Sequence, residues 1–270
     1  MNIKIKKIAV LLLIPFILTL PACTAKKQSE ASATPRLKIG SDIYSPYFYV
    51  DDNGNFAGID VEIATEACKR LNMEPEFKQI AWQNKDTFLS DGSIDCLWGS
   101  FSINGRENEY AWAGPYMHSR QVAVVNASSD IQTLADLNGK SVAAQNGSKP
   151  EQLFLSESVS GVSVSRVYSF PNMSNVFATL KKEYVDAAAG HETACRDYMK
   201  QISGDFRIVD GVLLASELGV AFRKDADNET VKKLTSVLRE MRLDGTIRGI
   251  LLKYDLDADY ALGEDFDNEK

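Results

Sequence analysis

Residues 91–106 read DGSIDCLWGSFSINGR, and this stretch indicates the fold. Asp91 and Gly92 form a turn signal, and the run 94–98 that follows is nearly all apolar. A short apolar strand of this kind is buried on both faces, which is typical of a parallel sheet. The polar loop that ends at Arg106 therefore follows directly on a buried strand.

Strands and helices alternate on either side of this stretch, which predicts an α/β fold with mostly parallel sheets. Apolar residues at helical spacing predict a helix over 60–71, with Asp60 as its N-cap. The acidic segment 255–270 has little to bury and is expected to be partly solvated. The other expected segments are strands at 37–40, 76–80, 94–98, 121–125, 141–144, 162–168, 185–189, 206–209 and 218–222, and helices at 84–90, 131–137, 173–181, 191–201 and 228–254, the last with a break at 244–245.

The length and composition fit about two globular domains. The chain has 270 residues, of which 44% are hydrophobic and 25% charged. These values exclude a disordered, collagen-like or multi-span membrane chain. The formal net charge is −7, and an acidic surface disfavours a phosphate backbone, so nucleic acid is not an expected partner.

The first 22 residues have the pattern of a signal peptide. Lys4, Lys6 and Lys7 precede an uncharged run over 8–20, which is short for a membrane span but fits a signal-peptide core. Leu-Pro-Ala-Cys at 20–23 resembles the bacterial lipobox, in which the cysteine sulfur receives a diacylglycerol and becomes the new N-terminus. We therefore expect lipidation at Cys23, with a coincidental cysteine as the alternative. Residues 23–36 are then a lipidated, flexible tether.

Seven short motifs, in this order, resemble the solute-binding proteins of bacterial ABC importers, family 3, which bind polar amino acids. The resemblance covers about residues 37–256. The motifs are 39–48 (IGSDIYSPYF), 58–62 (GIDVE), 92–95 (GSID), 100–106 (SFSINGR), 137–140 (LNGK) with Val142, Gly147 and Ser148, 182–187 (KEYVDA) and 243–247 (LDGTI). The resemblance implies the two-lobed type II periplasmic-binding-protein fold, with two crossover strands as the hinge. Lobe 1 is expected at 37–120 and 225–258, lobe 2 at 121–224, and an acidic tail at 259–270.

The resemblance also implies a site for a small carboxylate ligand between the lobes. Arg106 offers a bidentate fork for the carboxylate, with a surface salt bridge as the alternative role. Ser100 and Ser102 are expected to donate hydrogen bonds. Gly147 and Ser148 open a helix, where backbone N–H groups favour an anion, although simple helix capping explains them too.

Four further residues are candidates for contact with the rest of the ligand. Tyr44 and Trp82 match the aromatic positions that sandwich the ligand side chain in the family, and a place in the core is the alternative for Trp82. His191 stands where the family has an ammonium-binding aspartate, and the adjacent Glu192 is an alternative partner. A packed or helix-capping imidazole is the other interpretation of His191, whose unperturbed pKa of about 6.5 predicts a pH-dependent site.

These features favour a non-catalytic, monomeric receptor for a small amino-acid-like solute. It would be held outside the cytoplasm by a lipid anchor and serve the permease and separate ATPase of an importer. Two alternatives remain: a dehydratase-like enzyme in which His191 and Glu192 act as acid and base, and a sensor subunit that presents the ligand to a membrane protein. No zinc spacing, no P-loop and no cofactor motif is present in the sequence. Cys68 and Cys96 are interpreted as small buried hydrophobes.

Overall fold

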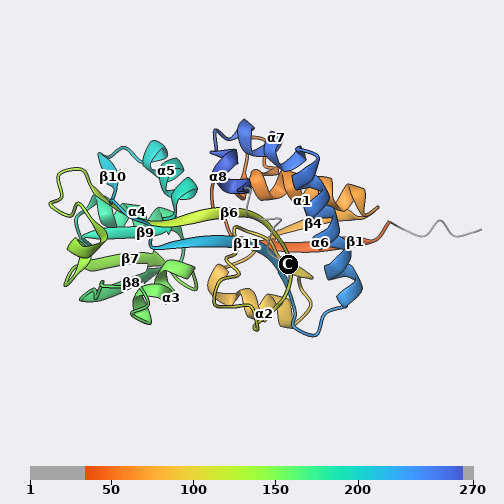
Figure 1. Cartoon of the computed structure of the whole chain (residues 1–270), viewed down its shortest axis with the longest axis horizontal. Helices are drawn as coiled ribbons and strands as arrows, with labels where there is room; N and C mark the ends of the chain where they lie inside the picture. Colours follow the sequence, from red (N-terminus) through yellow and green to blue (C-terminus); the bar gives the residue numbers. More distant parts are fainter. Residues whose placement is uncertain (1–33, 264–270) are drawn as a thin grey trace, which may run out of the picture. The chain divides into compact units, whose positions relative to one another are not determined.

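The computed structural model describes residues 34–263 (Figure 1). The predicted signal peptide 1–22, the lipidation site Cys23 and most of the tether 23–36 lie outside the described residues. Residues 264–270 of the predicted tail lie outside them as well.

Within residues 34–263, nine strands form one sheet, whose order is β4-β1-β5-β11-β6-β9-β7-β8, with β10 paired to β6. Strands β2 and β3 form a separate hairpin. The strands are β1 (Arg36–Ser41), β2 (Tyr49–Val50), β3 (Phe56–Ala57), β4 (Glu74–Gln79), β5 (Cys96–Leu97), β6 (Ala111–Asn126), β7 (Ser141–Gln145), β8 (Arg166–Phe170), β9 (Ala187–His191), β10 (Phe206–Ile208) and β11 (Leu214–Phe222).

The sheet consists of two parallel groups joined by two antiparallel strands. In the first group β1 pairs in parallel with β4 and β5, and in the second β7 pairs in parallel with β8 and β9. Strands β6 and β11 pair with each other and run between the two groups (Figure 1). The described structure therefore has two lobes connected by two crossover strands, as predicted.

Helices cover both faces of each lobe (Figure 1). In the first lobe α1, α6 and α7 lie on one face and α2 on the other, and in the second lobe α4 and α5 lie opposite α3. The helices are α1 (Ile59–Arg70), α2 (Lys85–Ser90), α3 (Lys149–Leu155), α4 (Met173–Lys181), α5 (Glu192–Gln201), α6 (Asn228–Leu243), α7 (Thr246–Lys253) and α8 (Ala258–Leu262), with the 3-10 helices η1 (Trp82–Asn84) and η2 (Leu134–Leu137).

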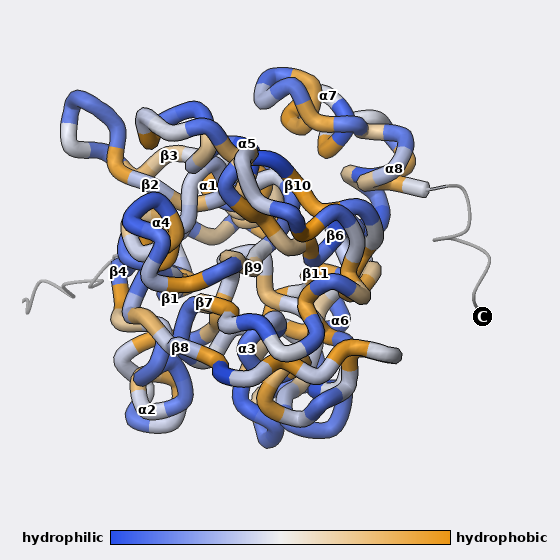
Figure 2. The backbone as a smooth tube through the Cα atoms, turned by 90° about the vertical axis from the view of Figure 1, so that its left-hand side faces the viewer, coloured by the Kyte–Doolittle hydropathy of each residue, from blue (hydrophilic) through white to orange (hydrophobic). Residues whose placement is uncertain are grey.

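Apolar side chains between these layers form the core. Phe177 of α4 stacks on Tyr198 of α5 at 5.6 Å, and both are buried against the second lobe's sheet. Full burial of such a side chain stabilises the fold by about 1.5–3 kcal/mol. Cys68, Cys96 and Cys195 are free and fully buried, so the interpretation of Cys68 and Cys96 as small core residues is confirmed. In contrast, the turn between β2 and β3 is hydrophilic and stands away from the body (Figure 2).

Local sequence signals explain where several helices begin and end. Asn172 caps α4 by accepting a hydrogen bond from the Asn175 N–H at 2.9 Å, and Asp227 caps α6 in the same way. Gly245 takes a left-handed conformation, with φ of 83°, and so separates α6 from α7. The predicted break at 244–245 is therefore confirmed.

Some sequence-based expectations were wrong. Asp60 is not the N-cap of α1, because Gly58 holds that position and the Asp60 carboxylate points into the protein. The segment expected as a helix over 131–137 is only the 3-10 turn η2. The predicted strand 121–125 is the end of a 16-residue strand, β6.

The C-terminal segment was also expected to be more solvated than it is. Helix α8 lies within the predicted tail, and Ala258 and Ala261 are buried against the core. The acidic residues of this segment, such as Asp257 and Asp259, are on its exposed side. No helix within residues 34–263 combines the length and the apolar character that a membrane span needs.

Gly58 generates a stability prediction, because it fits tightly against the loop that carries Tyr44. Its φ is 125°, and a Cβ there would stand 2.3 Å from the Tyr47 carbonyl oxygen. Gly58→Ala is expected to lower the free energy of unfolding by roughly 3 kcal/mol or more, since it adds a backbone clash to the left-handed strain. Urea denaturation measures the effect.

Gly54→Ala is the matched control. Gly54 also has a positive φ, 83°, but a Cβ there would meet no atom within 4 Å. The expected cost is therefore only the strain, about 1–2 kcal/mol. Equal losses in the two variants would contradict the packing argument.

Candidate ligand-binding site

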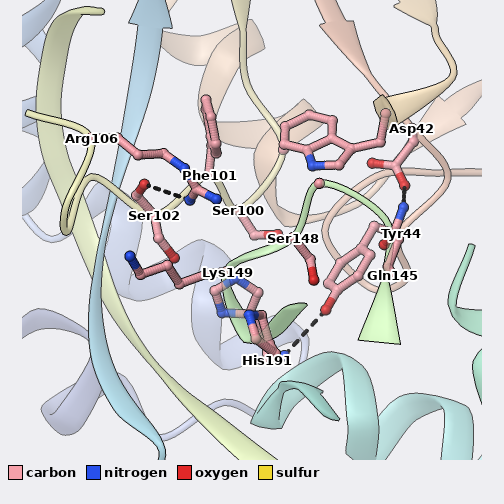
Figure 3. A pocket seen from close by; sticks show the side chains of 14 residues that line it. Asp42, Tyr44, Ser100, Phe101, Ser102, Arg106, Gln145, Ser148, Lys149 and His191 are labelled. Atoms are coloured by element: carbon pink, nitrogen blue, oxygen red, sulfur yellow. Dashed lines mark hydrogen bonds between the residues drawn. The ribbon is translucent and has the colours of Figure 1, made fainter. Parts of the chain in front are cut away.

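A cavity lies where strands of both lobes end (Figure 3). Residues at or just after the carboxyl ends of β1 and β5 line one side of it, and residues at the carboxyl ends of β7 and β9, or just after them, line the other. Open α/β sheets bind ligands at this edge. The lining residues are Asp42, Tyr44, Trp82, Gly99, Ser100, Phe101, Ser102, Arg106, Gln145, Gly147, Ser148, Lys149, Pro150 and His191.

Eight of the nine residues expected at the ligand site line this cavity. They are Tyr44, Trp82, Ser100, Ser102, Arg106, Gly147, Ser148 and His191. Glu192 does not. Its carboxylate accepts hydrogen bonds from Arg120 at 3.2 Å and from Arg196 at 2.7 Å, and it lines a different groove.

Arg106 is buried although its guanidinium has no carboxylate partner among the described residues. Within residues 34–263, its guanidinium donates one hydrogen bond, to the Ser102 carbonyl oxygen at 3.4 Å, and it also lies 5.1 Å from the centre of the Phe101 ring. Burial lowers the pKa of Arg106. Arg106 therefore does not form the surface salt bridge that was its alternative role.

The loop that carries Arg106 is bonded to the crossover strand β11. The Ile103 N–H donates to the Glu217 carbonyl at 2.9 Å, and the Gly219 N–H donates to the Phe101 carbonyl at 3.0 Å. Ser102 forms an isolated bridge with Leu218. These bonds fix the loop as an extension of the sheet.

Ser100 has a left-handed backbone, with φ of 44°, that a buried carboxylate holds in place. Its N–H donates to Asp60 Oδ2 at 2.6 Å, and the Tyr116 hydroxyl donates to Asp60 Oδ1 at 2.8 Å. Burial raises the pKa of Asp60 to about 7. Asp60 therefore positions a cavity residue instead of capping its helix.

The segment before α3 is only partly open to an anion. The Gly147 N–H already donates to Glu151 Oε2 at 2.6 Å, and the Ser148 hydroxyl caps the helix by accepting from the Glu151 N–H at 3.3 Å. The helix-capping interpretation of Ser148 is thus confirmed. Lys149, the first residue of α3, brings a side chain to the cavity instead.

Tyr44 and Trp82 are both buried in the cavity wall. Trp82 packs edge-on against Phe101, with ring centres 5.0 Å apart. The Tyr44 hydroxyl accepts a hydrogen bond from the His191 N–H at 3.2 Å, which joins the two lobes across the cavity (Figure 3).

His191, the last residue of β9, belongs to a buried polar cluster with residues of the crossover strand β6. Its Nδ1 lies 3.0 Å from the Ser119 hydroxyl, and its Nε2 lies 2.9 Å from Nε2 of Gln121. Burial lowers the pKa of His191 to about 3. The imidazole is therefore neutral at physiological pH, and the expectation of a protonation change near pH 6.5 is corrected.

Three polar residues of the cavity escaped the sequence analysis: Asp42, Gln145 and Lys149. Asp42 directly follows strand β1, and Gln145 is the last residue of strand β7. Their position at the ends of parallel strands was the sequence signal that could have identified them. The Gln145 amide donates to the Asp42 carboxylate across the cavity. Within residues 34–263, no cluster of three or more His, Cys, Asp or Glu side chains is arranged to hold a metal ion.

The lowered pKa of His191 predicts a pH-dependent stability. An unfolded histidine gains a proton below about pH 6.5, whereas His191 in the folded protein stays neutral down to about pH 3. The contribution of His191 to the free energy of unfolding is therefore complete above pH 6.5. It is lost as the pH falls towards 3, at up to about 1.4 kcal/mol per pH unit.

Comparison with His191→Gln isolates this contribution, because all other groups titrate in both proteins. Wild type should lose free energy of unfolding relative to the variant between pH 6.5 and pH 4. Urea denaturation at several pH values measures the difference. A difference that stays constant over this range would contradict the buried, neutral state of His191.

Comparison with known proteins agrees with this architecture. Residues 37–257 match the family model of bacterial extracellular solute-binding proteins, family 3. The histidine-binding periplasmic protein of Salmonella typhimurium is 30% identical over 234 residues, which are 83% of this chain and 89% of the relative.

Two examples come from the solved structures that resemble the described fold. An ancestral arginine-binding protein bound to arginine has 31% identity and a TM-score of 0.73, covering 81% of this chain and 97% of its own. The ancestral amino acid-binding protein AncCDT-1, a precursor of cyclohexadienyl dehydratase, has 26% identity and a TM-score of 0.71, covering 81% and 95%. The two lobes, the crossover strands and the family match together establish that this chain belongs to the bacterial extracellular solute-binding proteins, family 3.

Proposed function

We propose that the protein is a non-catalytic receptor of a bacterial ABC importer. It captures a small amino-acid-like carboxylate in the cavity and delivers it to the importer's permease, while the ATPase is a separate chain. The observation that carries this proposal is the buried Arg106, which faces the cavity without a carboxylate partner among the described residues.

The cost of desolvating a carboxylate explains why a buried arginine without a partner indicates a ligand site. A small carboxylate loses its water on entering a cavity, which costs several kcal/mol unless hydrogen-bond donors replace that water. Arg106 provides two parallel donors, and the hydroxyls of Ser100 and Ser102 lie in the same wall. Tyr44 and Trp82 add apolar surface for the remainder of the ligand.

The proposal includes a place outside the cytoplasm. We infer that Cys23 carries a lipid that holds the protein on the membrane and that residues 24–36 act as the tether. We expect a monomer, since one chain supplies both sides of the cavity.

A dehydratase-like activity is the second candidate, because one similar solved structure is described as a precursor of such an enzyme. That activity needs an acid and a base beside the ligand. His191 lines the cavity, but Glu192 is paired with Arg120 and Arg196 outside it. The pair that sequence analysis suggested is therefore not assembled, which favours the receptor.

A thermal-shift screen tests the proposal as a whole. The mature protein is screened against the twenty amino acids, simple amines and small carboxylic acids. A ligand at 100 times its dissociation constant adds about 2.7 kcal/mol to the free energy of unfolding. The absence of a shift with every compound would contradict the receptor proposal.

Arg106→Ala tests the carboxylate fork. The variant is expected to weaken a carboxylate ligand by about 2–5 kcal/mol, because the fork's hydrogen bonds and charge are lost. The melting temperature of the free protein should change little, since Arg106 forms no ion pair with the residues that the structure describes. Titration calorimetry measures the affinity, and Arg166→Ala, on an exposed strand position, is the control. Normal binding by Arg106→Ala would remove Arg106 from the ligand site.

Cys23→Ala tests the lipid anchor. The variant is expected to accumulate as an unlipidated precursor, since the sulfur that receives the lipid is absent. Detergent partitioning and mass spectrometry of the N-terminus measure this outcome, with Ser29→Ala in the tether as the control. A wild-type N-terminus at another position, without lipid mass, would contradict the lipoprotein assignment.

A further inference from the structure

Three buried cations gather at one end of the cavity. Lys85, Arg106 and Lys149 are each no more than 9% exposed. Arg106 and Lys149 line the cavity itself (Figure 3). Lys85 lies at its edge, next to the lining residue Gly147. A Cβ added at Gly147 would be 3.2 Å from Lys85 Nζ.

The protein offers these cations little compensation. Lys149 Nζ donates only to the Gln152 side-chain oxygen, at 3.2 Å, and neither Lys149 nor Arg106 forms an ion pair within residues 34–263. The carboxylate that pairs with Lys85 is that of the exposed Asp86, at 3.7 Å, and the charge of Lys85 also acts on the buried Asp42. Glu107 and Glu109, whose charges act on Lys149, are exposed as well.

Burial of like charges without counter-ions is unfavourable. Desolvation lowers the pKa of Lys85, Arg106 and Lys149, and the charge of Arg106 lowers the pKa of both lysines further. The free protein therefore carries an electrostatic cost at this end of the cavity, which an anion would relieve on binding.

The rest of the cavity does not balance this charge. Asp42 is the one carboxylate among the lining residues, it is engaged by the Gln145 amide, and burial raises its pKa to about 6. It lies at the side of the cavity away from Arg106 (Figure 3). Two lining cations against one carboxylate leave the cavity wall positive. Two further charges adjoin Gly147, the cation Lys85 and the carboxylate of Glu151, which accepts from the Gly147 N–H at 2.6 Å, and together they leave this net positive charge unchanged.

From this imbalance we infer that the ligand carries two acidic groups and a net negative charge. One carboxylate occupies the Arg106 fork, and the second acidic group pairs with the Lys149 ammonium. Both a dicarboxylic amino acid and a plain dicarboxylate have this chemistry. The inference rests on the proposed receptor function and narrows its ligand class.

Matched ligand pairs test the inference by calorimetry on the mature protein. Glutamate is compared with glutamine and aspartate with asparagine, because each pair differs in charge at nearly constant shape. Glutarate and succinate test whether the amino group is needed, and arginine and lysine supply the opposite charge. We expect at least one acidic compound to bind more than tenfold more tightly than its amide, or than any cationic compound.

Lys149→Met separates a ligand contact from a structural role. It should weaken the acidic ligand more than tenfold and leave its amide counterpart unchanged, while Lys149→Arg should keep the preference for the acid. The melting temperature of free Lys149→Met should stay equal or rise, because an uncompensated buried charge is removed. Lys182→Met, at an exposed position, is the control and should bind as wild type does.

The outcomes distinguish this inference from the proposed function. If an amide or a cationic amino acid binds as tightly as the acids do, the charge inference is wrong and the receptor function stands. If Lys149→Met weakens the binding of the acid and of its amide equally, Lys149 does not pair with the second acidic group. If no compound in the panel or in the wider screen binds, the receptor function fails and the inference fails with it.

Discussion

The antiparallel pairing of β6 with β11 is the constraint on which the site depends. These strands belong to both lobes, so their register decides which residues meet across the cavity. β11 holds the Arg106 loop through the Ile103 and Gly219 hydrogen bonds. β6 holds His191, because Gln121 stands opposite it in the pairing of β6 with β9. The two sides of the candidate site are thus attached to one ladder.

Local signals allowed most of the fold to be predicted from sequence. Helix α4 was predicted at its observed bounds, since Asn172 caps it and its apolar residues follow one face. The first half of β6 was missed because the long-range pairing of this segment with β11 is not visible in the local sequence. Asp60 was misassigned as a cap because an aspartate near a helix start has the same sequence signature when it turns inward to Ser100.

The candidate site was predictable to the extent that its residues follow strand ends or match known motifs. Arg106 and His191 were found in this way, although sequence alone did not reveal that burial keeps His191 neutral. Lys149 was missed because a lysine in the first turn of a helix normally faces solvent. Only the packing of α3 against the cavity makes it a buried cation. Glu192 was included because adjacency in sequence does not say on which side of α5 a residue lies.

Lys85 and Lys149 occupy equivalent places in two short helices, and this placement has an evolutionary consequence. Each is the first residue of a short helix, α2 or α3, and neither belongs to a strand of the sheet. A point mutation at either position changes the charge in or beside the cavity but removes none of the backbone hydrogen bonds that hold the crossover ladder and the Arg106 loop. Duplicated copies of such a gene can therefore diverge in ligand charge without first losing a stable scaffold, and the same two positions are where a designed sensor would be retuned.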